Sequence, residues 1–102
     1  MLSGEQLLRT YEAQGISWRD MFLFTLPLSL QFLGDCERNQ VRLLGLDAFE
    51  PPEGESIRCR LEDCLDVSGK DYWDYSIEEL CQIVREFIAD RPNLLFEFVV
   101  DD

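Results

Sequence analysis

Residues 71–90 read DYWDYSIEELCQIVREFIAD, and the second half of this stretch decides the fold. Ser76 is a strong N-cap, and Glu79 stands three residues later, where its side chain can complete a capping box. The apolar residues that follow recur at the spacing of one helical face: Ile77, Leu80, Cys81, Val84, Phe87 and Ile88. Pro92-Asn93 ends the pattern. The stretch therefore predicts an amphipathic helix over residues 76–90 whose apolar face packs on the core.

Strands are predicted on both sides of this helix. After it, residues 94–100 read LLFEFVV, which is apolar on both faces except at Glu97 and so predicts a strand at the centre of a sheet. Before it, apolar and polar residues alternate, which predicts a hairpin of 28–33 with 40–46 and a third strand over 57–61.

The predicted hairpin has an alternative, and a loop follows it. Its apolar side chains also fit a helical stripe, formed by Leu30, Leu33, Val41 and Leu44. Residues 47–55 contain Pro51, Pro52 and Gly54, a composition that favours a loop.

Two helices are predicted at the start of the chain. Ser3 can cap the first, which Gly15 would end, and Ser17 can cap a second that must stop before Pro27. The predicted order is therefore α-α-β-β-β-α-β over residues 1–102. This order is typical of a single α+β domain with helices packed on one face of a mainly antiparallel sheet of about four strands.

The composition narrows the classes of partner. The chain has 102 residues, of which 46% are hydrophobic, so it can bury a core. It has 21 acidic residues, nine basic residues and no histidine, giving a formal net charge of −12. A field of this sign repels nucleic acids and anionic membranes and attracts basic proteins. We therefore expect a basic protein partner, with no direct contact to nucleic acid or membrane.

The four cysteines predict neither a metal site nor disulfides. No CxxC pair occurs among Cys36, Cys59, Cys64 and Cys81, and we expect no signal peptide before them. Cys59 and Cys81 fall on predicted core faces, so we expect reduced, mostly buried thiols in a soluble cytoplasmic protein. The absence of histidine removes the Ser-His-Asp and Cys-His forms of catalysis. No phosphate-binding glycine loop is present either, so we expect no cofactor and no enzymatic activity.

The acidic residues are concentrated in one third of the chain. Residues 47–79 hold eleven acidic side chains against Arg58, Arg60 and Lys70. A solubilising surface would explain this charge without any partner. Three aromatic residues in the same region, however, are of the kind that anchors protein interfaces. In the alternative arrangement, Trp73 would pack beneath the helix as a lid.

These features predict a partner-binding surface on either side of the aromatic run. We expect its residues to be Asp63, Asp66, Asp71, Tyr72, Trp73, Asp74, Tyr75, Glu78 and Glu79. In size, acidity and lack of catalytic residues the chain is similar to bacterial immunity proteins and to phage inhibitors of nucleases, including anti-CRISPR proteins. This resemblance is one of bulk character, with no alignable stretch. It implies an inhibitor whose carboxylates occupy or block phosphate sites of a nuclease or other nucleic-acid-handling protein. The alternative is an adaptor that binds a basic protein without inhibiting it.

Overall fold

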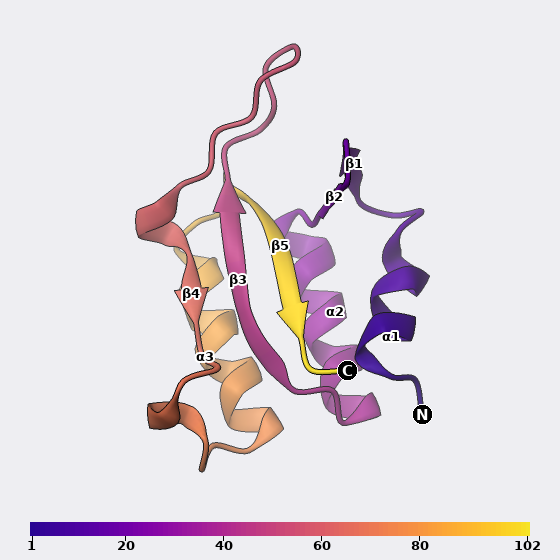
Figure 1. Cartoon of the computed structure of the whole chain (residues 1–102), viewed down its shortest axis with the longest axis vertical. Coiled ribbons are helices and arrows are strands. Elements are labelled where there is room, and N and C mark those ends of the chain that lie inside the picture. Colours follow the sequence, from indigo (N-terminus) through magenta and orange to yellow (C-terminus); the bar gives the residue numbers. More distant parts are fainter.

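A three-stranded antiparallel sheet forms one layer of the molecule, with two helices behind it (Figure 1). The computed structural model describes all 102 residues. The strand order is β4 (Leu65–Asp66), β3 (Leu43–Phe49), β5 (Leu95–Val100). The two helices of the second layer are α2 (Leu26–Asn39) and α3 (Ile77–Ala89).

The N-terminal region forms a smaller unit beside β5. It consists of helix α1 (Gly4–Tyr11) and a two-stranded hairpin of β1 (Ile16–Trp18) and β2 (Met21–Leu23). Just after β2, Phe24 pairs with Phe96 of β5 through two backbone hydrogen bonds of 2.7 and 2.9 Å. Two short 3-10 turns complete the chain, η1 (Leu61–Asp63) and η2 (Lys70–Tyr72). The predicted α+β class, with helices on one face of an antiparallel sheet, is confirmed. The order of elements is α-β-β-α-β-β-α-β instead of the predicted α-α-β-β-β-α-β, and the strands form sheets of three and two strands instead of one sheet of about four.

The core lies between the sheet and the two helices. On the sheet side, the cross-strand pairs Leu46–Phe98 and Ala48–Phe96 point into it. Because successive side chains alternate in a strand, the intervening pairs Gly45–Val99 and Asp47–Glu97 lie on the opposite, open face. The helices contribute an apolar stripe each: Leu28, Phe32, Leu33 and Cys36 from α2, and Cys81, Val84 and Ile88 from α3.

Three of the predicted elements are present. The Ser3 and Ser76 side chains each accept the backbone N–H of the residue three positions later, and both capping boxes are complete. These boxes begin α1 and α3, and β5 covers residues 95–100 of the predicted strand over 94–100. The predicted end of the first helix at Gly15 is wrong, because α1 ends at Tyr11 and Gly15 does not take a left-handed conformation. The predicted central position of this strand is wrong, because β3 lies between β4 and β5.

The second predicted helix, beginning at Ser17, is wrong. This stretch is the β1–β2 hairpin, and Arg19 takes a left-handed backbone conformation in its turn. Trp18 and Met21 pack beside a small cluster of buried side chains, Leu23, Phe49 and Leu95. Contact with strands distant in the sequence therefore outweighs the local capping signal at Ser17.

The predicted hairpin of 28–33 with 40–46 is also wrong, since residues 26–39 form α2. The Thr25 side chain accepts the Leu28 N–H, and Pro27 occupies the first turn, where an amide donor is not needed. The helix ends at Gln40 in a left-handed conformation. The helical alternative is correct for residues 26–39, but its stripe is wrong, because Leu30 is exposed and Val41 and Leu44 lie beyond the end of α2.

The region between β3 and η1 differs from its prediction as well. The predicted loop over 47–55 starts late, because β3 continues to Phe49. The predicted strand over 57–61 is reduced to a single bridge between Phe49 and Cys59. Cys59 is exposed there, so its predicted core position is wrong, whereas Cys36 and Cys81 are buried as expected. None of the helices has both the length and the apolar character required to cross a membrane.

Truncation of the α3 stripe should destabilise the fold. Leu80 is fully buried, so Leu80→Ala should lower the free energy of unfolding by about 2–5 kcal/mol through lost contacts and a residual cavity. Urea denaturation followed by circular dichroism measures this change. Gln82→Ala, at an exposed position of the same helix, is the matched control and should change stability by less than about 0.5 kcal/mol. Equal effects of the two variants would contradict the assigned helix face.

Candidate protein-interaction site

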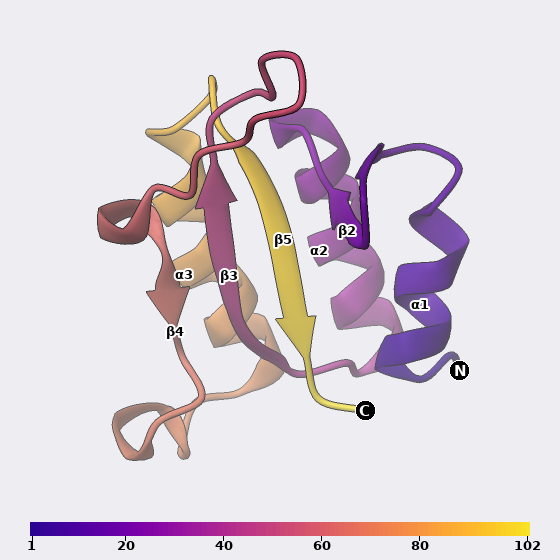
Figure 2. The ribbon, with the colours of Figure 1, turned by 45° about the horizontal axis from the view of Figure 1, so that its top comes forward.

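Residues 66–79, here called the acidic-aromatic segment, connect β4 to the first turn of α3. Figures 1 and 2 place this segment at one end of the sheet, opposite the loop that follows β3. At its start, Asp66 accepts hydrogen bonds from the Ser68 hydroxyl at 2.6 Å and from the Ser68 N–H at 2.8 Å. These bonds lower the pKa of Asp66 and fix the turn that follows β4.

Arg42, which lies just before β3, holds the centre of the segment in place. Its guanidinium donates to the carbonyl oxygens of Tyr72, at 2.7 Å, and Tyr75, at 2.8 Å. The two tyrosine rings also contact each other edge-on, with centroids 5.5 Å apart. The aromatic run is therefore tied to the sheet and has a defined conformation.

Trp73 is the most exposed aromatic side chain of the segment. It is 68% exposed, and its indole N–H donates to the Ser68 carbonyl at 3.3 Å. Tyr75 is 37% exposed, and Tyr72 is half-buried. The alternative in which Trp73 forms a lid beneath α3 is therefore wrong; the aromatic side chain that turns inward is Tyr72.

The carboxylates around Trp73 carry uncompensated charge. The segment holds five acidic residues, Asp66, Asp71, Asp74, Glu78 and Glu79, all exposed. None of them lies within ion-pair distance of a cation, and Lys70 is the one basic residue among them. Glu79 also accepts the Ser76 N–H as part of the helix cap, so its orientation is fixed.

Asp63 is separated from the other predicted binding residues. Its side chain is 15% exposed and lies 2.8 Å from Arg91 and 3.4 Å from Arg60. These contacts tie η1 to the end of α3. The structure thus brings eight of the nine predicted residues together in the segment and gives Asp63 an internal pairing role.

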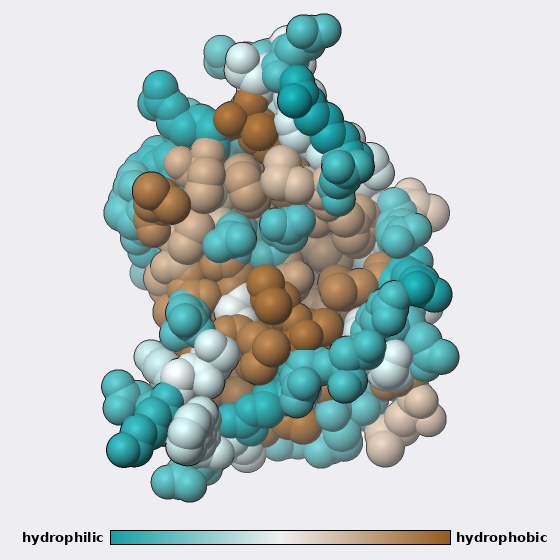
Figure 3. Space-filling view, viewed as in Figure 1, coloured by the Kyte–Doolittle hydropathy of each residue, from teal (hydrophilic) through white to brown (hydrophobic).

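The structure shows an apolar groove beside the acidic-aromatic segment, which the sequence did not predict. It has a volume of about 320 Å³ and lies on the open face of the sheet, where Leu44 and Val99 line it together with Asp66 and Ser68. Leu65 borders it from β4, although the Leu65 side chain packs on the core side of the sheet. Figure 3 shows apolar surface gathered over the middle of this face with hydrophilic residues around it. The groove therefore continues the acidic-aromatic segment onto the sheet.

Close approach of β4 to β3 depends on Gly45. A Cβ at this position would lie 2.5 Å from the Leu65 carbonyl oxygen, so only glycine fits beneath β4. The register of β3 with β5 also shifts between Leu43 and Gly45. Sequence patterns gave no indication of the groove, because it forms only when these three strands are paired.

Two carboxylates face each other across the open face next to the groove. Asp47 of β3 and Glu97 of β5 are cross-strand partners, both half-buried, and neither forms an ion pair. Burial, together with the charge of Asp47, raises the pKa of Glu97. Glu97 stood out in the sequence as a lone charge in an apolar strand. Its partner could not be identified, because Asp47 was predicted to lie in a loop.

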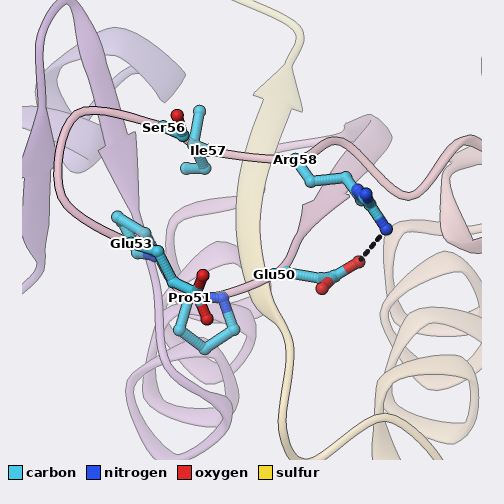
Figure 4. A pocket seen from close by; sticks show the side chains of 7 residues that line it. Glu50, Pro51, Glu53, Ser56, Ile57 and Arg58 are labelled. Carbon is cyan, nitrogen blue, oxygen red and sulfur yellow. Dashed lines mark ion pairs between the residues drawn. The ribbon is translucent and has the colours of Figure 1, made fainter.

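The largest surface hollow lies elsewhere and contains no reactive set of side chains. It has a volume of about 730 Å³ and is enclosed by the loop after β3, residues 50–58. Figure 4 shows Arg58 reaching toward Glu50, 3.7 Å away, at the base of this loop. Ile57 is its single hydrophobic lining residue. No group of three carboxylate or thiol side chains in the molecule converges as metal ligands.

Comparison of the chain with protein-family models, with curated proteins and with solved structures gives no match in any of the three. The functional assignment therefore depends on the geometry described above.

Neutralising Glu97 should stabilise the protein at neutral pH. Because the folded-state pKa of Glu97 is raised, the folded protein loses stability as pH rises from the unfolded value, about 4.3, through the folded value. Glu97→Gln removes this penalty, so its free energy of unfolding should exceed that of the wild type at pH 7. The difference should disappear at about pH 3.5, where Glu97 is protonated in both states.

Urea denaturation at the two pH values measures the effect. Glu12→Gln is the control, because Glu12 is exposed and forms no ion pair. A gain at pH 7 that persists unchanged at the lower pH would show that the effect does not come from ionisation of Glu97.

Proposed function

We propose that this chain is a non-enzymatic acidic protein that binds and inhibits a basic, nucleic-acid-handling protein. The observation that carries the proposal is the exposure of Trp73 on an anchored segment among five unpaired carboxylates. An exposed tryptophan buries a large apolar area when a partner covers it, and tryptophan is among the residues enriched at the energetic centres of interfaces.

The anchoring of the segment favours binding. Arg42 and the Ser76–Glu79 cap already fix the backbone on both sides of the aromatic run. A surface that is ordered before association loses less conformational entropy when it binds. The groove beside the segment adds apolar area, so a partner can cover Trp73 and the sheet face together.

The charge pattern supports the class of partner. Grooves that bind nucleic acid present arginine and lysine to successive phosphates. The exposed carboxylates of the segment offer a cluster of negative charge to such a groove, and the net charge of −12 speeds the encounter. Occupation of a phosphate-binding groove would block substrate and so inhibit the partner.

Affinity capture tests the proposal. The chain is immobilised and exposed to extract from cells of the organism that encodes it, at low and at high salt, and the retained proteins are identified by mass spectrometry. We expect a basic nucleic-acid-binding protein that is retained more strongly at low salt. Its purified form should lose nuclease or nucleic-acid-binding activity at a one-to-one ratio.

The outcomes of this experiment separate the two candidate functions. Stoichiometric inhibition supports the inhibitor. Binding of a basic protein whose activity is unchanged supports an adaptor instead. Recovery of no basic protein at either salt concentration contradicts both.

Truncation of Trp73 should weaken binding without unfolding the domain. Trp73→Ala should lower affinity for the captured partner by about 2 kcal/mol, or roughly 30-fold in Kd, because the side chain is exposed in the free protein and would be buried in the complex. Leu30→Ala, which removes an exposed apolar side chain from α2, is the control and should leave affinity unchanged. Calorimetry gives both affinities. A large loss of thermal stability in Trp73→Ala would instead assign this residue a structural role.

Charge reversal in the segment should act mainly on the association rate. The double variant Asp71→Lys, Asp74→Lys places positive charge beside Trp73, so it should slow association and reduce its dependence on salt. Glu12→Lys with Asp20→Lys makes the same change in net charge at two exposed positions near the N-terminus. Surface plasmon resonance over a range of salt concentrations compares the two. Equal slowing would show that net charge alone attracts the partner.

A further inference from the structure

Two cysteines that are five residues apart in the sequence have neighbouring thiols. The Sγ atoms of Cys59 and Cys64 are 3.9 Å apart, compared with about 2.05 Å in a disulfide bond. Cys59 is exposed and Cys64 is half-buried. One sulfur is therefore open to reagents, and the other lies within a short side-chain movement of it.

Both thiols are positioned by the end of β3. Cys59 forms a bridge with Phe49, and the N–H of the next residue, Arg60, donates to the Ala48 carbonyl at 2.8 Å. The Ala48 N–H in turn donates to Cys64 Sγ at 3.4 Å, and this thiol donates to the Arg60 carbonyl at 3.4 Å. The two sulfurs are thus placed by contacts to the end of the same strand.

The chain between the thiols is also fixed. It forms the η1 turn, in which Arg60 contacts Asp63, and Asp63 contacts Arg91 at the end of α3. A bond between the sulfurs would close a small ring around this turn. The other two cysteines offer no comparable site, because Cys36 and Cys81 are fully buried in the core.

We propose that Cys59 and Cys64 form a redox modification site, at which a small neutral hydroperoxide converts the two thiols into an intramolecular disulfide. The class of oxidant follows from the charge of the whole chain. Next to Cys59, the carboxylates of Glu50, Glu62 and Asp63 are paired with arginines and largely balance one another. The net charge of −12, however, opposes the approach of anionic disulfides such as oxidised glutathione but not that of hydrogen peroxide.

The reaction has two steps. The Cys59 thiolate attacks one oxygen of hydrogen peroxide, the O–O bond breaks, and Cys59 sulfenic acid forms while the other oxygen leaves as water after taking up a proton. The Cys64 sulfur then attacks the Cys59 sulfur, the S–O bond breaks, and the hydroxyl leaves as water with the Cys64 proton. In sum, two thiols and one peroxide give one disulfide and two water molecules.

The environments of the two thiols assign their order. Cys59 is exposed, so it meets the oxidant first. Burial raises the pKa of Cys64 to about 11, so this side chain stays a thiol at neutral pH and reacts poorly with peroxide itself. Its position beside Cys59 suits it to attack the sulfenic acid.

Peroxide treatment of the full chain, followed by dimedone and peptide mapping, tests the proposal. Dimedone traps sulfenic acid. In the wild type we expect a Cys59–Cys64 disulfide, a mass loss of about 2 Da and little dimedone label, because the neighbouring thiol acts at an effective concentration of millimolar or more. Cys64→Ser should stop at the sulfenic acid and carry roughly ten times more label at Cys59. Cys59→Ser should form neither product.

Several results would overturn the proposal. These are a wild-type Cys59 that accumulates as labelled sulfenic acid, a disulfide that joins two chains or includes Cys36 or Cys81, and a Cys59→Ser variant that oxidises like the wild type. Circular dichroism of the reduced proteins checks folding. Cys59 is exposed, and a serine hydroxyl can keep the two backbone contacts of Cys64, so both variants should fold.

Discussion

The pairing of Phe24 with Phe96 is the interaction on which the rest of the structure depends. It joins the N-terminal unit to β5, and the Phe24 ring contacts Phe32 and Phe98 with centroid distances of 5.0 and 5.1 Å. This one residue therefore links the hairpin, α2 and the sheet. With the N-terminal unit beside β5 and two helices behind the sheet, the open face and the β4 side remain free of covering elements (Figure 2). The groove lies on this uncovered face, and the acidic-aromatic segment lies at its end.

Local sequence signals predicted the elements that are stabilised by local contacts. They failed where a contact with a distant residue determines the secondary structure. The helix over 76–90 was predictable because its cap and its apolar stripe lie within one stretch, and the structure keeps both. The hairpin from Ser17 to Phe24 was not, since it is held by the pairing of Phe24 with a residue 72 positions later. Pro27 alone predicts the end of a helix, although proline in a first turn equally marks a start, and Thr25 caps the helix that begins here.

The same distinction applies to the candidate sites. The acidic-aromatic segment could be found from the sequence, because its carboxylates and aromatic rings are contiguous. The groove could not, because Leu44, Leu65 and Val99 come from three strands whose register no local pattern specifies. The sequence also does not predict the ion pair of Asp63, because its partner Arg91 is distant in the chain. It does not predict the proximity of Cys59 and Cys64 either, because this proximity requires both residues to contact the end of β3.

Almost all basic side chains of the chain form contacts within the molecule. Eight of the nine basic side chains contact a carboxylate or a backbone carbonyl, and Lys70 alone has no such contact. Six of the 21 acidic side chains take part in ion pairs, which leaves 15 without a cation within reach. Arg42 is an example, because its guanidinium donates to two backbone carbonyls and pairs with no carboxylate. It therefore holds the aromatic run in place without neutralising the carboxylates beside it. The resulting self-repulsion costs folding free energy. A basic partner would relieve that repulsion on binding, so the charge that weakens the free domain would strengthen the complex.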